Sequence, residues 1–201
     1  MSSSKKESLI LEGLNLVLKG LHEEFGLILD DNFQGTPERV YKSYREMFQG
    51  LINTDEEIAK ILSSSFPSDG YSSIIAALEI EVYSMCPHHI LPVEYKIHLA
   101  YIPSKEKGRV LGVSKLIRVV ELLAKRPVLQ EKLTKDILVA FRKINPLGIA
   151  VVVEGTHSCM KMRGVRSPHS TITTSAMDGC FENEMASREE FFHLIRMQKR
   201  W

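Results

Sequence analysis

The first stretch of apolar residues recurs at helical spacing. Between residue 5 and about residue 29, apolar side chains follow one another at intervals of three and four, which predicts an amphipathic helix. The periodicity is compatible with a helix packed on its own domain and with one packed against a partner subunit. After a predicted loop at 30–35, Thr36 caps a second helix with Pro37 at its first position. A third helix is predicted over 54–62.

The pattern changes after a loop-forming segment at 66–71, which is rich in Pro, Ser, Asp and Gly. We therefore expect a boundary here between a helical N-terminal region, 1–70, and a catalytic domain, 71–201. Alternating apolar and polar residues predict strands over 78–85 and 94–102, and further strands are expected at 149–153 and 171–176. Helices are predicted from Ser114, over 128–144 and over 187–197. This order indicates an α+β fold, with an antiparallel sheet and helices on one face.

Composition and charge narrow the classes of function. The chain has 201 residues, of which 44% are hydrophobic and 25% are charged, as in a soluble globular protein. Its formal net charge of +1 provides no basic field for nucleic acid. No apolar run has the length of a membrane span, and the polar start has no signal-peptide core. Three cysteines without a secretion signal predict reduced thiols in the cytoplasm.

Two short segments carry the strongest chemical signal. Cys86-Pro87-His88-His89 ends one predicted strand, and His157-Ser158-Cys159 follows another. Together they offer two thiols, one imidazole ligand and two spare histidines. Three protein ligands with an open fourth position are typical of a catalytic zinc site, whereas a structural site needs a fourth close ligand. The alternative is a buried thiol beside a core histidine.

Pairs of charged residues lie at helix starts. Arg39 with Lys42, and Lys115 with Arg118, are three residues apart and share a helix face. Such pairs are either solvated surface or phosphate contacts. Glu131 lies in the first turn of a predicted helix, where acidic residues often stabilise the helix dipole.

The order of these motifs resembles the GTP cyclohydrolase I family. The resemblance runs from about residue 36 to residue 197. It implies a tunnelling fold, with a four-stranded antiparallel sheet, two helices on one face and a helical N-terminal extension. It also implies pentameric rings that stack into a homodecamer with active sites between subunits. The matching segments are Thr36 to Val40, Cys86 to His89, Ser114 to Arg118, Gln130 to Thr134, His157 to Val165 and Ser170 to Ser175.

The resemblance also implies an activity and a role for each matching residue. The family converts GTP and water to 7,8-dihydroneopterin triphosphate and formate, with zinc hydroxide attacking the purine at C8. By similarity Cys86, His89 and Cys159 bind zinc. His88 and His157 are the candidates for proton transfer. The remaining matches bind substrate: Glu131 and its neighbour Gln130 at the guanine, and Ser114, Lys115, Arg118, Arg163, Arg39 and Lys42 at the phosphates.

The sequence departs from the family pattern beside the metal ligands and the guanine-binding helix. Pro87 stands where the family usually has Glu, and Val128 replaces the first Gln of a Gln-x-Gln-Glu motif. Val93 and Tyr95 stand where an aromatic residue and Gly are usual, and Tyr95 adds bulk where the backbone is expected to bend. These departures leave two alternatives open. One is a related zinc hydrolase that acts on another purine nucleotide or stops at the ring-opened formamide; the other is a non-catalytic GTP-binding relative.

Overall fold

A computed structural model describes residues 8–104 and 109–198, and the chain forms two compact units, Met1–Phe48 and Gln49–Trp201. The predicted start of the first helix at residues 5–7 lies outside the described residues. The first unit contains helix α1 (Leu9–Phe25), the 3-10 turn η1 (Asp31–Phe33) and helix α2 (Thr36–Met47). No residue of α1 is buried within the chain, so its predicted apolar face is exposed. Gly35 is the cap of α2 and Thr36 its first residue, so the helix begins one position earlier than predicted.

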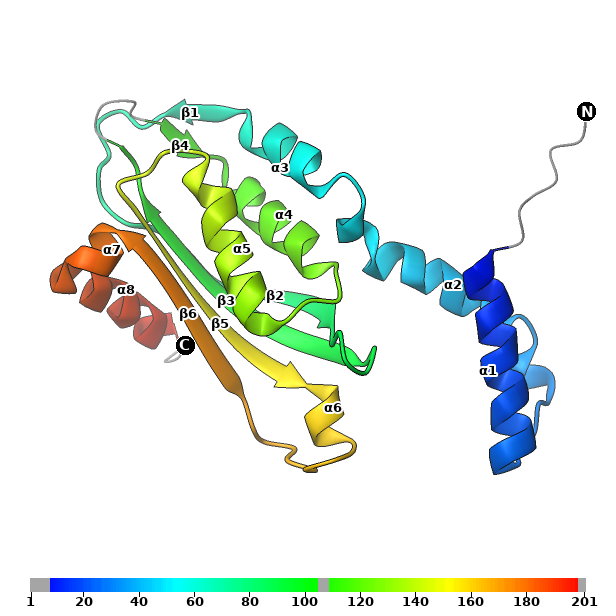
Figure 1. Ribbon diagram of the computed structural model, residues 1–201. Coiled ribbons are helices and arrows are strands. Elements are labelled where there is room, and N and C mark those ends of the chain that lie inside the picture. The colour runs from blue at the N-terminus through cyan, green and yellow to red at the C-terminus, as the bar shows by residue number, and fades with distance from the viewer. Residues whose placement is uncertain (1–7, 105–108, 199–201) are drawn as a thin grey trace, which may run out of the picture. The chain divides into compact units, whose positions relative to one another are not determined.

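The second unit is built on a four-stranded antiparallel sheet with the order β2-β3-β5-β6. Helices α4 and α5 lie together on one face of this sheet, which confirms the predicted α+β arrangement (Figure 1). The 3-10 turn η2 (Gln49–Leu51) and α3 precede the sheet. The elements are α3 (Thr54–Leu62), β2 (Ile75–Met85), β3 (Pro92–Ile102), α4 (Val113–Ala124), α5 (Gln130–Arg142), β5 (Gly148–His157) and β6 (Ile172–Gly179).

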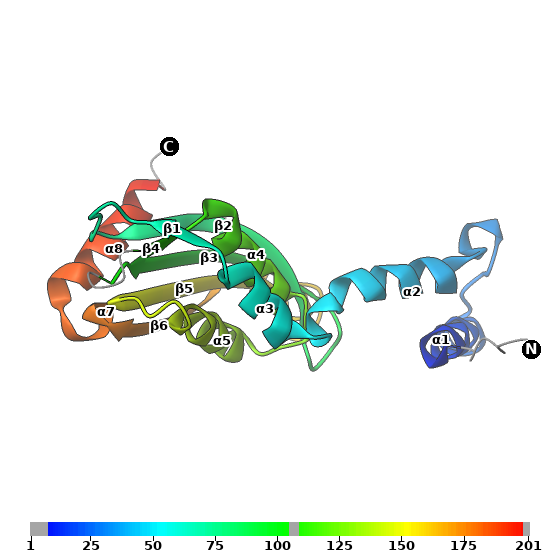
Figure 2. The ribbon, with the colours of Figure 1, turned by 90° about the horizontal axis from the view of Figure 1, so that it is seen from above.

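Successive side chains along each strand point to opposite faces of the sheet, and a buried apolar cluster lies on each face. Ile97 and Leu99 of β3 are fully buried and pack in one cluster with Leu133 and Ile137 of α5. The intervening residues face the other way. There, small residues such as Ala100 form a second cluster with aromatic rings of α7 (Cys180–Asn183) and α8 (Met185–Gln198). Figure 2 shows α7 and α8 gathered at one end of the sheet. Helices therefore cover part of the second face as well, which the sequence pattern did not predict.

The segment predicted as a linker at 66–71 is partly ordered as a strand. β1 (Ser65–Pro67) pairs with β4 (Arg109–Leu111) in a separate two-stranded sheet. The sequence also predicts a turn at 105–108, which lies outside the described residues. Ile58 and Leu62 of α3 are buried in the main core, so this helix belongs with the sheet. The compact units consequently divide after Phe48 and not near residue 70. The functional division of the chain stays a prediction.

Candidate metal centre and its surroundings

Strand register brings the two candidate motifs together at one end of the sheet. Ser84 of β2 and His157 of β5 both pair with Val93 of the central strand β3. Since β2 and β5 both run antiparallel to β3, they end at the same edge of the sheet, one on each side of β3. Cys86 directly follows β2, and Cys159 lies in the short helix α6 (Ser158–Lys161) that continues from β5 (Figure 1). Residues 73 positions apart along the chain thus meet at one site.

The predicted metal ligands form a compact cluster. The Cys86 Sγ atom lies 3.9 Å from Cys159 Sγ and 3.6 Å from His89 Nδ1. One ligand atom from each residue lies within 4.8 Å of the others. Cys86 is buried, Cys159 is partly buried and His89 is exposed, so the cluster is closed on the protein side and open to solvent. Two thiols and an imidazole are a ligand set that suits zinc and leaves a fourth position free.

Cys180 is not part of this cluster. It follows β6, and its backbone N–H donates to the Leu147 carbonyl, next to the start of β5. The cluster lies at the other end of β5. Within the described residues, the geometry therefore gives three ligands and not four, as the catalytic type of site requires.

The turn that carries Cys86 is tight and strained. The Cys86 N–H donates to Leu91 O, and the Ile90 N–H donates to Cys86 O, each at 2.9 Å. Ile90 has a φ of 51°, a left-handed conformation that is unfavourable for a β-branched residue. Pro87 is exposed in this turn, outside the paired strands. His88 Nδ1 lies 3.9 Å from Cys86 Sγ, so this spare histidine is beside the cluster.

His157 is held by the side chain of Gln130. The Gln130 Nε2 atom donates to the carbonyls of Val153, at 3.0 Å, and Ile172, at 2.8 Å. Its amide oxygen therefore faces His157, whose Nε2 atom lies 3.0 Å away. Because an amide oxygen only accepts, Nε2 of His157 carries the proton and Nδ1 has the free lone pair. Burial lowers the pKa of His157, and the negative charge of Glu131 opposes this, so the neutral ring is favoured.

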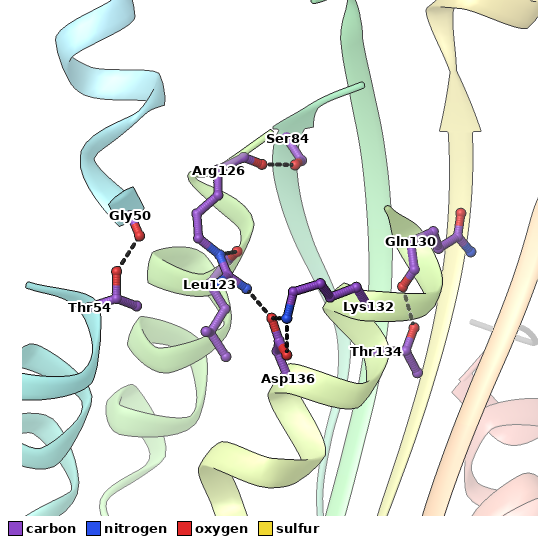
Figure 3. Close-up of polar contacts among 9 residues, drawn as sticks. All are labelled: Gly50, Thr54, Ser84, Leu123, Arg126, Gln130, Lys132, Thr134 and Asp136. Carbon is purple, nitrogen blue, oxygen red and sulfur yellow. Dashed lines mark hydrogen bonds and ion pairs between the residues drawn. The ribbon is translucent and has the colours of Figure 1, made fainter. Parts of the chain in front are cut away.

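The connection between α4 and α5 is bonded to β2 through Arg126 and Ser84, as Figure 3 shows. Ser84 Oγ donates to the Arg126 carbonyl at 2.8 Å, and Arg126 Nη2 lies 2.7 Å from Asp136 Oδ2 on α5. Thr134 Oγ1 donates to the Gln130 carbonyl at 2.8 Å, closing the first turn. Glu131 in this turn is exposed and its charge acts on the pKa of His157, so it lies close to the candidate site.

Not all residues that are predicted to bind phosphate lie at the metal-ligand cluster of the same chain. Arg163 Nη1 lies 2.9 Å from His89 Nε2. The start of α4, with Ser114, Lys115 and Arg118, is at the opposite end of the sheet, because the end of α4 adjoins β2 near Ser84. Lys115 Nζ instead donates to Ile61 O at 2.8 Å and to Ser64 Oγ.

The remaining two predicted phosphate contacts lie in the first unit. Arg39 donates to Gln34 O at 2.7 Å and to Thr36 Oγ1 at 2.8 Å, so its guanidinium stabilises the entry to α2. Lys42 lies on the same helix.

Tyr95 is a neighbour of the site that the motifs did not assign. It pairs with Gly155 across the ladder, and its backbone is ordinary strand without a positive φ. The expected bend is therefore absent, and the glycine opposite makes room for the ring. A Cβ atom at Gly155 would lie 2.8 Å from Tyr95 Cε1. The Tyr95 and His157 rings meet edge to face, with centroids 6.0 Å apart and an interplanar angle of 84°. The replacement of the family's usual Gly by Tyr95 was the sequence signal that could have marked Tyr95 as a residue of the site.

The chain is thus an α+β protein with an antiparallel sheet. Where β2 and β5 end at one edge of this sheet, a Cys-His-Cys cluster offers three metal ligands, the number found in catalytic zinc sites. The GTP cyclohydrolase I family model matches residues 18–196. The chain belongs to the GTP cyclohydrolase I family. No helix in the described ranges is both long and apolar enough to span a membrane.

Curated relatives are similar over most of the chain. The GTP cyclohydrolase 1 of Thermoanaerobacter pseudethanolicus is 46% identical over 82% of this chain and 85% of its own. That of Corynebacterium glutamicum strain R is 46% identical over 80% of each. That of Hydrogenobaculum sp. is 40% identical over 93% of this chain and 96% of its own. Among solved structures, the apo archaeosine synthase QueF-Like is 20% identical, with a TM-score of 0.41, over 53% of this chain and 94% of its own.

Proposed function

We propose that this protein is a zinc-dependent GTP cyclohydrolase I that converts GTP and water to 7,8-dihydroneopterin triphosphate and formate in the cytoplasm. The observation that carries the proposal is that Gln130 orients the imidazole of His157 at the end of β5, two residues before Cys159, whose sulfur clusters with the ligand atoms of Cys86 and His89. Membership of the family supports the same activity.

The residues present fit a zinc ion. Cys86 and Cys159 would supply thiolates and His89 a neutral imidazole, and the exposed side of the cluster would admit water and substrate. When bound, zinc would act as a Lewis acid that activates water for attack at C8 of the purine. The hydroxyl of Tyr95, which is buried without a hydrogen-bond partner near the cysteines, is the kind of orphaned polar atom expected beside such a centre.

Proton transfer falls to the two histidines that do not bind metal. Because Nε2 of His157 donates to Gln130, only Nδ1 can take up a proton from the attacking water. His88 is exposed beside Cys86 and can exchange protons between the site and solvent as the imidazole ring of the purine opens. Two histidines with different surroundings thereby divide the roles of base and acid.

Substrate binding uses charge at the edge of the cluster. The exposed carboxylate of Glu131 accepts hydrogen bonds from the guanine N–H groups, with Gln130 beside it in the same turn. The guanidinium of Arg163 offers a planar fork for phosphate oxygens. Ser114, Lys115 and Arg118 reach the cluster of a neighbouring copy, in a homodecamer whose active sites lie between subunits. The resemblance to the family adds Arg39 and Lys42 to the phosphate-binding residues.

Product analysis tests the proposal. Purified zinc-loaded protein is incubated with GTP, and the mixture is oxidised and analysed for fluorescent neopterin and for formate. We expect both products from the wild type. His157→Ala should retain zinc and lose turnover, and Cys180→Ser, outside the cluster, should retain zinc and activity. Normal turnover by His157→Ala would refute the role of His157.

The departures at Pro87 and Tyr95 favour one alternative function. This alternative is a zinc hydrolase that acts on another purine nucleotide or stops at the ring-opened formamide. Consumption of GTP with neither formate nor neopterin would indicate the ring-opened formamide, because formate is released only when that formamide is hydrolysed. Binding of GTP without any product would favour a non-catalytic relative. Each outcome is separable in the same assay, because product, formate and bound nucleotide are measured independently.

A further inference from the structure

The hydroxyl of Tyr95 is buried and has no hydrogen-bond partner among the described residues. The side chain is 2% exposed. A buried polar group without a partner destabilises a fold, and such groups are rare in native proteins. Phenylalanine would fill the same space without this cost, so the hydroxyl calls for an explanation.

Tyr101 shows that the fold can provide a hydrogen-bond partner for a buried phenol on this face of the sheet. It lies on the same strand and the same face as Tyr95, and it is fully buried. Its hydroxyl accepts a hydrogen bond from the Leu111 N–H at 2.9 Å. The two tyrosines differ in their neighbours, and Tyr95 is the one that lies at the metal-binding end of the sheet.

Tyr95 is surrounded by residues of the candidate metal centre. Its ring meets His157 edge to face and packs in the same buried cluster as Cys86. Burial raises the pKa of Tyr95, and the negative charges of Cys86, Glu131 and Cys159 raise it further, in that order. A phenol O–H can donate a hydrogen bond to such a group. The hydroxyl is closed off from bulk solvent, and of these three charged neighbours Cys86 is the buried one.

We propose that Tyr95 is a positioning residue of the metal centre, whose O–H donates a hydrogen bond to the Cys86 sulfur when that sulfur is a metal-bound thiolate. This inference rests on the metal site of the proposed function. A thiol is a weak acceptor, whereas a thiolate carries a full charge and makes a stronger, charge-assisted hydrogen bond. Partners of this kind orient metal ligands and tune the metal, and their loss weakens metal binding by about 10- to 100-fold.

The test compares Tyr95→Phe with Tyr101→Phe as a matched control. Zinc affinity is measured by competition with a chromophoric chelator, and the thiolate-to-metal charge-transfer bands are recorded with Co²⁺ in place of zinc. For Tyr95→Phe we expect about 10-fold weaker zinc binding and shifted charge-transfer bands. The melting temperature of its metal-free form should be equal to or higher than that of the wild type, because an unsatisfied hydroxyl is removed. Tyr101→Phe should melt lower and bind zinc like the wild type.

The possible results separate this inference from the proposed function. Unchanged zinc affinity and unchanged bands in Tyr95→Phe, with zinc bound to the wild type, would overturn the inference alone. Weaker GTP binding at unchanged zinc affinity would also overturn it, since the hydroxyl would then serve the nucleotide. Zinc retained by Cys86→Ala with Cys159→Ala would instead refute the metal site. If Tyr95→Phe does not fold, Tyr95→Met gives the same comparison, because it keeps bulk and lacks the donor.

Discussion

The side-chain amide of Gln130 fixes the orientation and the tautomer of His157. Both N–H groups of the amide face backbone carbonyls, so the amide oxygen is the atom that lies 3.0 Å from His157 Nε2. Gln130 is 3% exposed, which excludes the competing water that would weaken this assignment. Gln130, which is predicted to bind the guanine, thus also orients His157, the proposed general base.

The Gln130 and His157 side chains should be energetically coupled. Gln130→Leu removes the donor to the Val153 and Ile172 carbonyls, of which the first is buried, and an acceptor from His157, so we expect a loss of about 1–3 kcal/mol in the free energy of unfolding. Urea unfolding of Gln130→Leu, His157→Leu and the double variant, all metal-free, measures the coupling, which should exceed about 0.5 kcal/mol. Additive losses would mean that the contact is not made in solution.

Gly155 should not tolerate a side chain. A Cβ atom there would lie 2.2 Å from Gln130 Oε1 and 2.8 Å from Tyr95 Cε1, so both neighbours would have to move. We expect Gly155→Ala to lower the free energy of unfolding by about 1–3 kcal/mol and to reduce kcat through displacement of Gln130. Gly112→Ala is the control, since its Cβ would meet the Phe66 ring at 3.4 Å and the Lys115 Cε atom at 4.0 Å. Equal stability of the two variants would contradict the packing at Gly155.

Arg163 should matter for phosphate more than for metal. Its guanidinium contacts His89 Nε2 at 2.9 Å but is not a metal ligand. Arg163→Gln is expected to weaken binding of GTP and of inorganic triphosphate by at least about 10-fold, the loss of a charged hydrogen bond, and to leave zinc stoichiometry unchanged. Calorimetric titration checks both ligands. Loss of zinc together with triphosphate would show that Arg163 supports the metal ligands instead.

The ion pair between Arg142 and Asp178 should contribute to stability above mildly acidic pH. A 2.5 Å hydrogen bond from Arg142 Nε lowers the pKa of Asp178 below its ordinary value, although burial opposes this. The contribution is full above the unfolded pKa of about 3.9 and is lost as pH falls through the lower folded pKa. Arg142 is half exposed, so the contribution is below about 1 kcal/mol.

Urea unfolding at pH 7 and pH 3 tests this pair. Arg142→Met should lower stability at pH 7 and have a smaller effect at pH 3, while Lys135→Met, exposed on the same helix, should show no such dependence. An equal loss at both pH values would assign the effect of Arg142 to packing and not to charge.

Most regular elements were predictable because their signals are local. The helix predicted over 54–62 is observed as Thr54–Leu62, and the alternating strands are observed with longer ends. The strand β1 was missed because its three residues pair with Arg109–Leu111, more than 40 positions away. The short helices α6 and α7, of four residues each, are set by the strands they follow and carry no periodic pattern.

The sequence by itself determined the chemistry available to this protein: its motifs name the thiols, imidazoles and charged groups, and their order identifies the family. Only the tertiary structure decided which of them meet. The parallel run of β2 and β5 places Cys86 beside Cys159, while α4 carries Lys115 to the far end of the sheet. It also decided that Gln130 faces His157 and that Tyr95 lies over Gly155. Such contacts depend on strand register and on the space left by distant residues, and no local pattern encodes either.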